Sequence, residues 1–174
     1  MKPIQERKRN RLQNYDYSQD GWCFVTICSQ NREEFFGKIE NDQMILNEYG
    51  KIVKNQWLWL GNQYNYVKLD EYIVMPNHFH GILVIYRRDR SRPVPTSESG
   101  KIKSLSELIG AFKTTSSKII HKNGFGNFAW QRSFYDHIIR DEKSLNNIRE
   151  YIKNNPMKWA IGKDRNHLQN MWEL

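Results

Sequence analysis

Residues 66–86 read YVKLDEYIVMPNHFHGILVIY, and this stretch decides the fold. Residues 66–75 and 78–86 are rich in β-branched and aromatic side chains, which is typical of strands. Pro76-Asn77 interrupts the run and predicts a turn between them. Because two strands joined by so short a turn pair with each other, we expect an antiparallel pair here.

Further strands and one helix are expected on the N-terminal side of this pair. Residues 22–29 (WCFVTICS) predict a strand, and residues 35–46 contain short strand-like pieces around the polar turn Glu40-Asn41-Asp42. Asn47 is a good N-cap for a helix that runs to about Leu60, because apolar residues after it follow helical spacing.

Two helices and one strand are expected on the C-terminal side. Residues 105–122 form an amphipathic pattern, and Ser104 with Glu107 predicts a capping box at its start. Residues 134–139 (FYDHII) predict a short strand. A last helix is expected over about residues 142–155, since the residue before Pro156 disfavours helical geometry.

This order of elements is strand, helix, paired strands, helix, strand, helix. It predicts an α+β fold with a ferredoxin-like (split βαβ) antiparallel sheet, helices on one face and an added C-terminal helix. We expect one domain over residues 21–160, between a basic arm at 1–20 and a tail at 161–174. Residues 87–104, rich in Pro, Ser and Arg, predict a mobile loop within that domain.

Composition narrows the function classes. The 174 residues carry 27 Lys and Arg against 19 Asp and Glu, for a net charge of +8, which favours a polyanionic partner such as nucleic acid. No apolar run approaches the ~20 residues of a membrane helix, and the basic start has no apolar stretch behind it. Cys23 and Cys28 fall on opposite faces of one strand and cannot bridge, so we expect a reduced, cytoplasmic (nucleoid-associated) protein.

His78 and His80 are the first candidate functional residues. At positions i and i+2 of a strand, both imidazoles project from the same face, while Phe79 points to the other. Two adjacent imidazoles are a natural pair of metal ligands. The same pattern also fits two half-buried histidines bonded to backbone or water.

Tyr151 and Asn155 are the second candidates. At i and i+4 they share one face of the last expected helix, about 5–6 Å apart at Cβ. A tyrosine hydroxyl beside an amide oxygen is a possible nucleophile next to a metal ligand. Taken alone, Tyr151 between Ile148 and Ile152 also fits a tyrosine in the core or at its rim.

Together these motifs resemble a known family. His78-Phe79-His80 after Met75-Pro76-Asn77, then WQRSFYDHIIRD at 130–141, and YIKNNP at 151–156 follow one another in the family's order. Residues 11–18 (RLQNYDYS) and 24–28 (FVTIC) add to the likeness. The chain resembles the single-tyrosine HUH (IS200-like) transposases, and specifically their REP-associated tyrosine transposase branch.

The resemblance implies cleavage and joining of single-stranded hairpin DNA. In such a protein His78, His80 and Asn155 hold a divalent metal ion, Mg²⁺ or Mn²⁺, which polarises the scissile phosphate. Tyr151 attacks that phosphate and stays joined to the 5′ phosphate. In the wider superfamily the residue at this position is often Gln. In the REP-associated branch it is Asn, which matches Asn155. A monomer and a homodimer are both compatible with the family, and no membrane is involved.

DNA-contacting residues are expected among the basic side chains. In this branch the N-terminal region helps to read a single-stranded tag beside the hairpin, which implies a role for Arg7, Lys8, Arg9 and Arg11. A track for the hairpin, or general phosphate contacts, could further be formed by Lys113, Lys118, Arg132, Arg140 and Arg149, although each alone also fits a plain surface residue. His137 matches a family histidine, for which orienting a metal ligand, contacting phosphate and packing are open roles.

Two other classes of function fit parts of the pattern. A non-catalytic single-strand-binding module would use exposed aromatics on a ferredoxin-like sheet. A metal phosphoesterase would use water in place of tyrosine and form no covalent adduct. The joint presence of two histidines, the tyrosine and the asparagine favours the nuclease and strand transferase.

Overall fold

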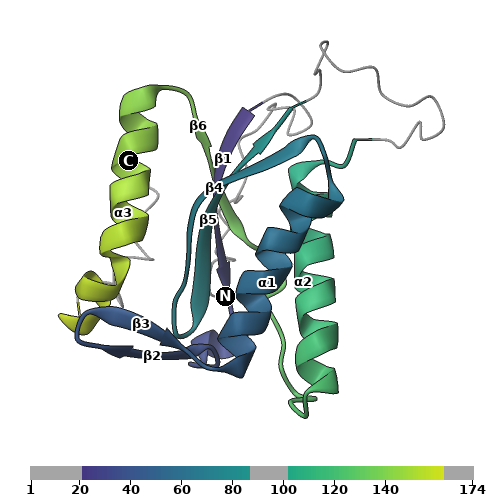
Figure 1. Cartoon of the computed structure of the whole chain (residues 1–174), viewed down its shortest axis with the longest axis vertical. Coiled ribbons are helices and arrows are strands. Elements are labelled where there is room, and N and C mark those ends of the chain that lie inside the picture. The colour runs from purple at the N-terminus through teal and green to yellow at the C-terminus, as the bar shows by residue number, and fades with distance from the viewer. Residues whose placement is uncertain (1–20, 87–101, 163–174) are drawn as a thin grey trace, which may run out of the picture.

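The structure is a computed structural model that describes residues 21–86 and 102–162 (Figure 1). The expected basic arm, residues 87–101 of the expected loop and residues 163–174 of the tail lie outside this part. In chain order the elements are β1 (Gly21–Cys28), the 3-10 turn η1 (Gln30–Arg32), β2 (Gly37–Glu40), β3 (Gln43–Leu46), α1 (Glu48–Gln63), β4 (Val67–Val74), β5 (His78–Ile85), α2 (Leu105–Lys122), β6 (Tyr135–Ile139) and α3 (Glu142–Ala160).

The central sheet has four antiparallel strands in the order β4-β5-β1-β6. This order is that of a split βαβ plan, in which the last strand lies beside the first. The expected ferredoxin-like α+β fold is confirmed. Strands β2 and β3 form a separate hairpin, whose turn residues Asn41 and Asp42 have φ angles of 48° and 60°, as a tight hairpin turn requires.

Local capping sets the start of each helix. The Asn47 side chain accepts a hydrogen bond from the Gly50 amide at 2.9 Å. At the start of α2, Ser104 and Glu107 form the complete expected capping box. Helix α2 begins and ends where the sequence predicts, because its cap and its apolar period agree.

The two faces of the sheet are covered differently. Helices α1 and α2 pack on one face, and α3 lies on the other (Figure 1). Strand alternation sends Phe79 and Leu83 of β5 into the cluster under α1 and α2, and Ile82 into a smaller cluster under α3. All eight residues of β5 are buried, since it is covered on both faces.

Helix α3 runs farther than the sequence predicts. It starts at Glu142, with Asp141 accepting from the Ser144 amide at 2.7 Å, but it continues through Pro156 to Ala160. The expected end near residue 155 was wrong. An internal proline costs about 3 kcal/mol through its missing N–H and ring clash. Burial of Ile152, Asn155, Pro156 and Trp159 against the sheet offsets that cost.

Cys23 and Cys28 are free and buried, as the strand alternation predicts. Burial raises the pKa of Cys23 to about 12 and also raises that of Cys28, so both stay as thiols at neutral pH. Within the described residues, none of the helices combines the length and apolar character needed to cross a membrane.

Candidate metal and tyrosine site

His78 and His80 lie side by side on β5, facing α3. Both side chains are fully buried, and their ring centroids are 4.5 Å apart. In the neighbouring strand β1, Cys28 pairs with His78 and Thr26 pairs with His80. The alternation of β5 therefore gives two imidazoles on one face, as expected, while Phe79 packs on Trp57 on the opposite face with a centroid distance of 4.6 Å.

Asn77 orients the ring of His78. Its side-chain Nδ2 donates to the Arg32 carbonyl at 2.9 Å, which leaves Oδ1 directed at His78 Nδ1, 2.7 Å away. Arg32 lies in the left-handed region, with φ of 56°, where only a few per cent of non-glycine residues occur. Since the amide oxygen only accepts, Nδ1 of His78 carries the proton and Nε2 presents its lone pair.

His80 is held between a threonine and a tyrosine. Thr26 Oγ1 lies 2.8 Å from His80 Nδ1, and the Tyr151 hydroxyl lies 3.3 Å from His80 Nε2. The Phe24 ring stacks on His80 at 5.4 Å and meets the ring of Tyr151 edge-on at 6.2 Å. These contacts fix the imidazole and the phenol relative to each other.

Burial keeps both histidines neutral. It lowers the pKa of His78 to about 3, with a smaller contribution from the charge of Arg32. The pKa of His80 is also well below its ordinary value, through burial first and the charge of His78 second. Neutral imidazoles are the form that binds metal ions.

Helix α3 brings three of its residues to the histidines. The ring of Tyr151 lies 5.3 Å from that of His80, and the ring of Trp159 lies 5.6 Å from that of His78. Asn155 is one helical turn from each of these residues and is fully buried. The structure therefore brings together His78, His80 and Tyr151, with Asn155 between the two points where α3 meets the histidines.

The side-chain amide of Asn155 is suited to act as a metal ligand. Neither its oxygen nor its nitrogen has a hydrogen-bond partner among the described residues, although both atoms are buried. Buried polar atoms are normally satisfied, so an orphaned amide on a functional face indicates a missing partner. The described residues contain no group of three or more His, Cys, Asp and Glu that could hold a metal ion. Two imidazoles and one amide oxygen are thus the donor set that this face offers, and it fits a divalent cation.

Three residues of the site were not singled out from the sequence. Thr26 and Asn77 hold the histidine rings, and the Lys158 ammonium lies 5.0 Å from the centroid of the Tyr151 ring. Asn77 stands next to the histidine motif, which is a usable signal. Thr26 requires the strand register, and Lys158 requires a helix that passes Pro156.

The expected DNA contacts are dispersed. Arg7, Lys8, Arg9 and Arg11 lie outside the described residues. Arg132 and Arg140 are exposed on loops, and Lys113 donates to the carbonyls of Gln131 and Arg132 at 2.6 and 3.0 Å. His137 is exposed on β6 opposite Phe24, one strand beyond the histidine pair. The contribution of these residues to DNA binding stays a prediction.

Comparison with known proteins gives two relatives in Haemophilus influenzae. One, itself uncharacterized, is 38% identical over 164 residues, which cover 90% of this chain and 91% of the relative. The other, named as a REP-associated tyrosine transposase, is 24% identical over 151 residues, covering 84% of this chain and 77% of the relative. No protein-family model matches the chain.

Two solved structures share the fold. A REP-associated tyrosine transposase bound to a REP hairpin superposes with a TM-score of 0.57 at 20% identity, over 89% of this chain and 74% of that one. A transposase-like protein from Deinococcus radiodurans gives 0.50 at 16% identity, over 83% of this chain and 95% of that one. The fold is thus that of the transposases.

The sequence relatives indicate which kind of transposase the chain resembles. The histidine pair, the tyrosine helix and the match to a named relative along most of the chain agree with one another. The chain is therefore similar, in sequence and in fold, to REP-associated tyrosine transposases.

Proposed function

We propose that this protein is a metal-dependent endonuclease and strand transferase that acts on single-stranded hairpin DNA through a 5′-phosphotyrosine intermediate. The observation that carries the proposal is the contact between the Tyr151 hydroxyl and His80 Nε2 at 3.3 Å, beside a buried neutral histidine pair. A nucleophile next to a metal-ligand set is the arrangement that tyrosine-dependent phosphoryl transfer requires.

His78, His80 and Asn155 would hold the metal ion, Mg²⁺ or Mn²⁺. The bound ion supplies Lewis-acid polarisation of the scissile phosphate. The chain itself supplies the orientation of the donors. Asn77 and Thr26 fix the two imidazoles, and the helical turn between Tyr151 and Asn155 keeps the nucleophile next to the amide ligand.

Tyr151 would attack the phosphorus atom through its phenolic oxygen. The phenol gives up its proton as its oxygen bonds to the 5′ phosphate, the P–O3′ bond breaks, and the departing oxygen takes up a proton to become a 3′ hydroxyl, so no net proton is gained or lost. A free tyrosine has a pKa near 10 and is a weak nucleophile at neutral pH. The Lys158 ammonium lies 5.0 Å from the centroid of the Tyr151 ring and makes a cation–π contact with it. Attack by another 3′ hydroxyl reverses the step and joins strands.

Hairpin DNA is the substrate class that the comparisons favour, because a solved relative of the same fold is bound to a REP hairpin. The excess of positive charge in the chain supports a polyanionic partner. A single-strand-binding module remains the runner-up, favoured by the same charge. It predicts binding that survives loss of Tyr151 and of metal.

A covalent-adduct assay tests the proposal. Single-stranded hairpin oligonucleotides from the DNA flanking the gene are incubated with the protein and Mn²⁺ or Mg²⁺, then separated on a denaturing gel. We expect a shifted band that requires metal and disappears in Tyr151→Phe. Tyr72→Phe is the matched control, because its ring stacks on Phe79 in the other core and its adduct yield stays at the wild-type level.

Other outcomes contradict the proposal in distinct ways. Cleavage without an adduct identifies water as the nucleophile and a phosphoesterase as the function. Binding of a wide hairpin set with neither cleavage nor adduct identifies the binding module. An adduct that persists in Tyr151→Phe assigns the nucleophile to another side chain.

A further inference from the structure

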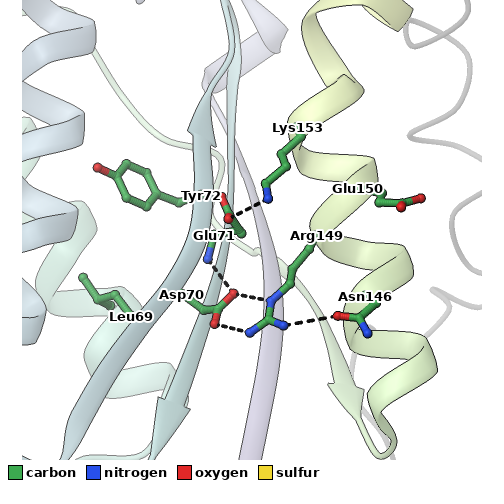
Figure 2. Close-up of a pocket in the computed structure, with 8 residues that line it drawn as sticks. All are labelled: Leu69, Asp70, Glu71, Tyr72, Asn146, Arg149, Glu150 and Lys153. Atoms are coloured by element: carbon green, nitrogen blue, oxygen red, sulfur yellow. Dashed lines mark hydrogen bonds and ion pairs between the residues drawn. The ribbon is translucent and has the colours of Figure 1, made fainter.

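A bulge in β4 faces the tyrosine helix. Leu69 pairs with Leu83 and Tyr72 pairs with Gly81, so Asp70 and Glu71 together oppose one residue of β5. A bulge of this kind re-aims side chains at the edge of a sheet. Here it directs two consecutive carboxylates toward α3 (Figure 2).

Both carboxylates bind basic residues of α3. Arg149 donates to Asp70 in a bidentate pair, with Nε to Oδ1 at 2.8 Å and Nη2 to Oδ2 at 2.6 Å. Lys153 lies 3.0 Å from a carboxylate oxygen of Glu71. These pairs cross an open groove of about 720 Å³ between β4 and α3 (Figure 2).

The Asp70–Arg149 pair is the more rigid of the two. The Glu71 amide also donates to Asp70 Oδ1 at 2.8 Å, so the bulge itself fixes the carboxylate. On the other side, Arg149 donates to Asn146 Oδ1 at 3.2 Å, and its guanidinium lies 5.8 Å from the centroid of the Trp22 ring. The ion pair between Lys153 and Glu71 is more exposed, since 60% of the Lys153 side chain is accessible to solvent. Bidentate geometry held from both sides gives directional, orientation-fixing contacts.

Helical geometry couples this pair to the nucleophile. At about 100° per residue, Arg149 and Lys153 lie roughly 60° and 100° to one side of the buried Ile152. Tyr151 and Asn155 lie about 100° and 60° to the other side. A rotation of α3 that releases Arg149 from Asp70 therefore moves Tyr151 relative to His80.

The apolar cluster under α3 is smaller than the one under α1 and α2. Among the described residues it has four buried members, with five partly buried side chains packed against them: Phe24, Ile82, Ile139 and Ile152, then Trp22, Ile73, Leu145, Ile148 and Tyr151. A small apolar cluster fixes the orientation of a helix weakly, because the hydrophobic effect is non-directional. Directional contacts at the edge of the helix are then what sets its rotation.

We propose that Asp70 and Arg149 are positioning residues of the transposase site, which set the rotation of α3 so that Tyr151 meets His80. The inference rests on the proposed function for its catalytic consequence, but the positioning of the helix is testable without catalysis. The competing interpretation is that Arg149 binds DNA phosphates and that its pair with Asp70 has no effect on the position of α3. The two interpretations predict opposite effects when Asp70 loses its charge.

Asp70→Asn separates them. It keeps the shape of the side chain and removes one negative charge from the groove, so the affinity for the polyanionic DNA stays equal or rises. If Asp70 positions α3, single-turnover formation of the adduct at saturating hairpin DNA falls by about tenfold or more, because displacements near 1 Å at a reacting group cost up to about 100-fold. If Arg149 serves only the DNA, the rate is unchanged or higher, which overturns the proposal.

Two further variants control this test. Glu150→Gln removes the same charge from the same groove. None of the hydrogen bonds and ion pairs drawn in Figure 2 reaches Glu150, so we expect the wild-type rate. Arg149→Lys keeps the positive charge but loses the bidentate fork, and we expect an intermediate rate. A rate for Glu150→Gln as low as that for Asp70→Asn contradicts a role specific to the ion pair.

A spectroscopic readout makes the result independent of catalysis. 4-Fluorophenylalanine placed at position 151 reports, through its ¹⁹F shift, the surroundings that Phe24 and His80 provide. We expect Asp70→Asn to move or broaden this resonance and Glu150→Gln to leave it in place. An unchanged resonance in Asp70→Asn overturns the proposal. If the resonance moves but the protein that carries Tyr151 forms no adduct with DNA, the positioning role is retained and the proposed chemistry is rejected instead.

Discussion

The two faces of the central sheet are made by the same four strands, yet they are covered by different kinds of contact. Under α1 and α2, a cluster of twenty buried residues includes the rings of Trp57, Phe79 and Phe112, which pack on one another in tilted and edge-on contacts. Under α3, the buried cluster has four members, and the partly buried Trp22, Ile73, Leu145, Ile148 and Tyr151 pack against it. This face also holds two buried neutral histidines and the Asn155 amide, which has no hydrogen-bond partner among the described residues. One face thus supplies most of the apolar stability, and the other holds polar groups that chemistry can use.

Acid tests this contrast most strongly. The pKa of His78 in the folded chain is about 3, against 6.5 ordinarily, and that of His80 is lowered in the same direction. Between these values the unfolded chain binds protons that the folded chain excludes, so stability falls as the pH drops from 6.5 toward 3. In the metal-free protein we expect the free energy of unfolding to fall by about 1.4 kcal/mol per pH unit for each histidine.

Urea unfolding at several pH values measures this slope. His78→Gln removes one of the two groups and is expected to flatten it. A slope that does not change in His78→Gln would mean that the histidine is not buried as a neutral group.

Truncation of one buried side chain on each face is expected to give unequal losses. Phe112 is fully buried and contacts the rings of Trp57, Phe79 and Trp130, so Phe112→Ala costs about 3–5 kcal/mol. Ile152→Ala costs about 2 kcal/mol, because α3 can settle into the space. Urea unfolding measures both, and hydrogen exchange of α1 and α3 shows where protection is lost. Equal losses would contradict the contrast between the faces.

A smaller effect is expected from Asn77, which forms a hydrogen bond with the proposed metal ligand His78. Asn77→Ala removes the acceptor that fixes the proton on His78 Nδ1, and we expect 10- to 100-fold weaker Mn²⁺ binding by calorimetry. Asn77→Asp keeps an acceptor at that place and is expected to restore affinity. If Asn77→Ala binds Mn²⁺ as tightly as the wild type, His78 does not need this orientation or is not a ligand.

Much of the fold could be predicted from the sequence because local signals agree with the tertiary packing. The capping box at Ser104 and the apolar period of residues 105–122 define α2, and the Pro76-Asn77 turn defines the β4–β5 pair. The histidine pair follows from strand alternation alone. The family resemblance added the link between that pair and Tyr151.

The features that the sequence did not predict depend on contacts between distant parts of the chain. Pro156 is a local stop signal that burial of Trp159 and its neighbours overrides, so Lys158 and Trp159 could not be placed on the tyrosine helix. Thr26 reaches His80 through the β1–β5 register, 54 residues away in the chain. Asp70 meets Arg149 across 79 residues only because β4 carries a bulge, for which the sequence offers no clear signal.

The position of α3 over its own sheet has a genetic consequence. Tyr151 and His80 meet within a single chain, so each copy of the protein carries the proposed nucleophile and its histidine neighbour together. As long as α3 stays on that sheet, a copy that lacks the tyrosine cannot be complemented by a copy that lacks the histidines. Two such alleles in one cell would remain as defective together as they are apart.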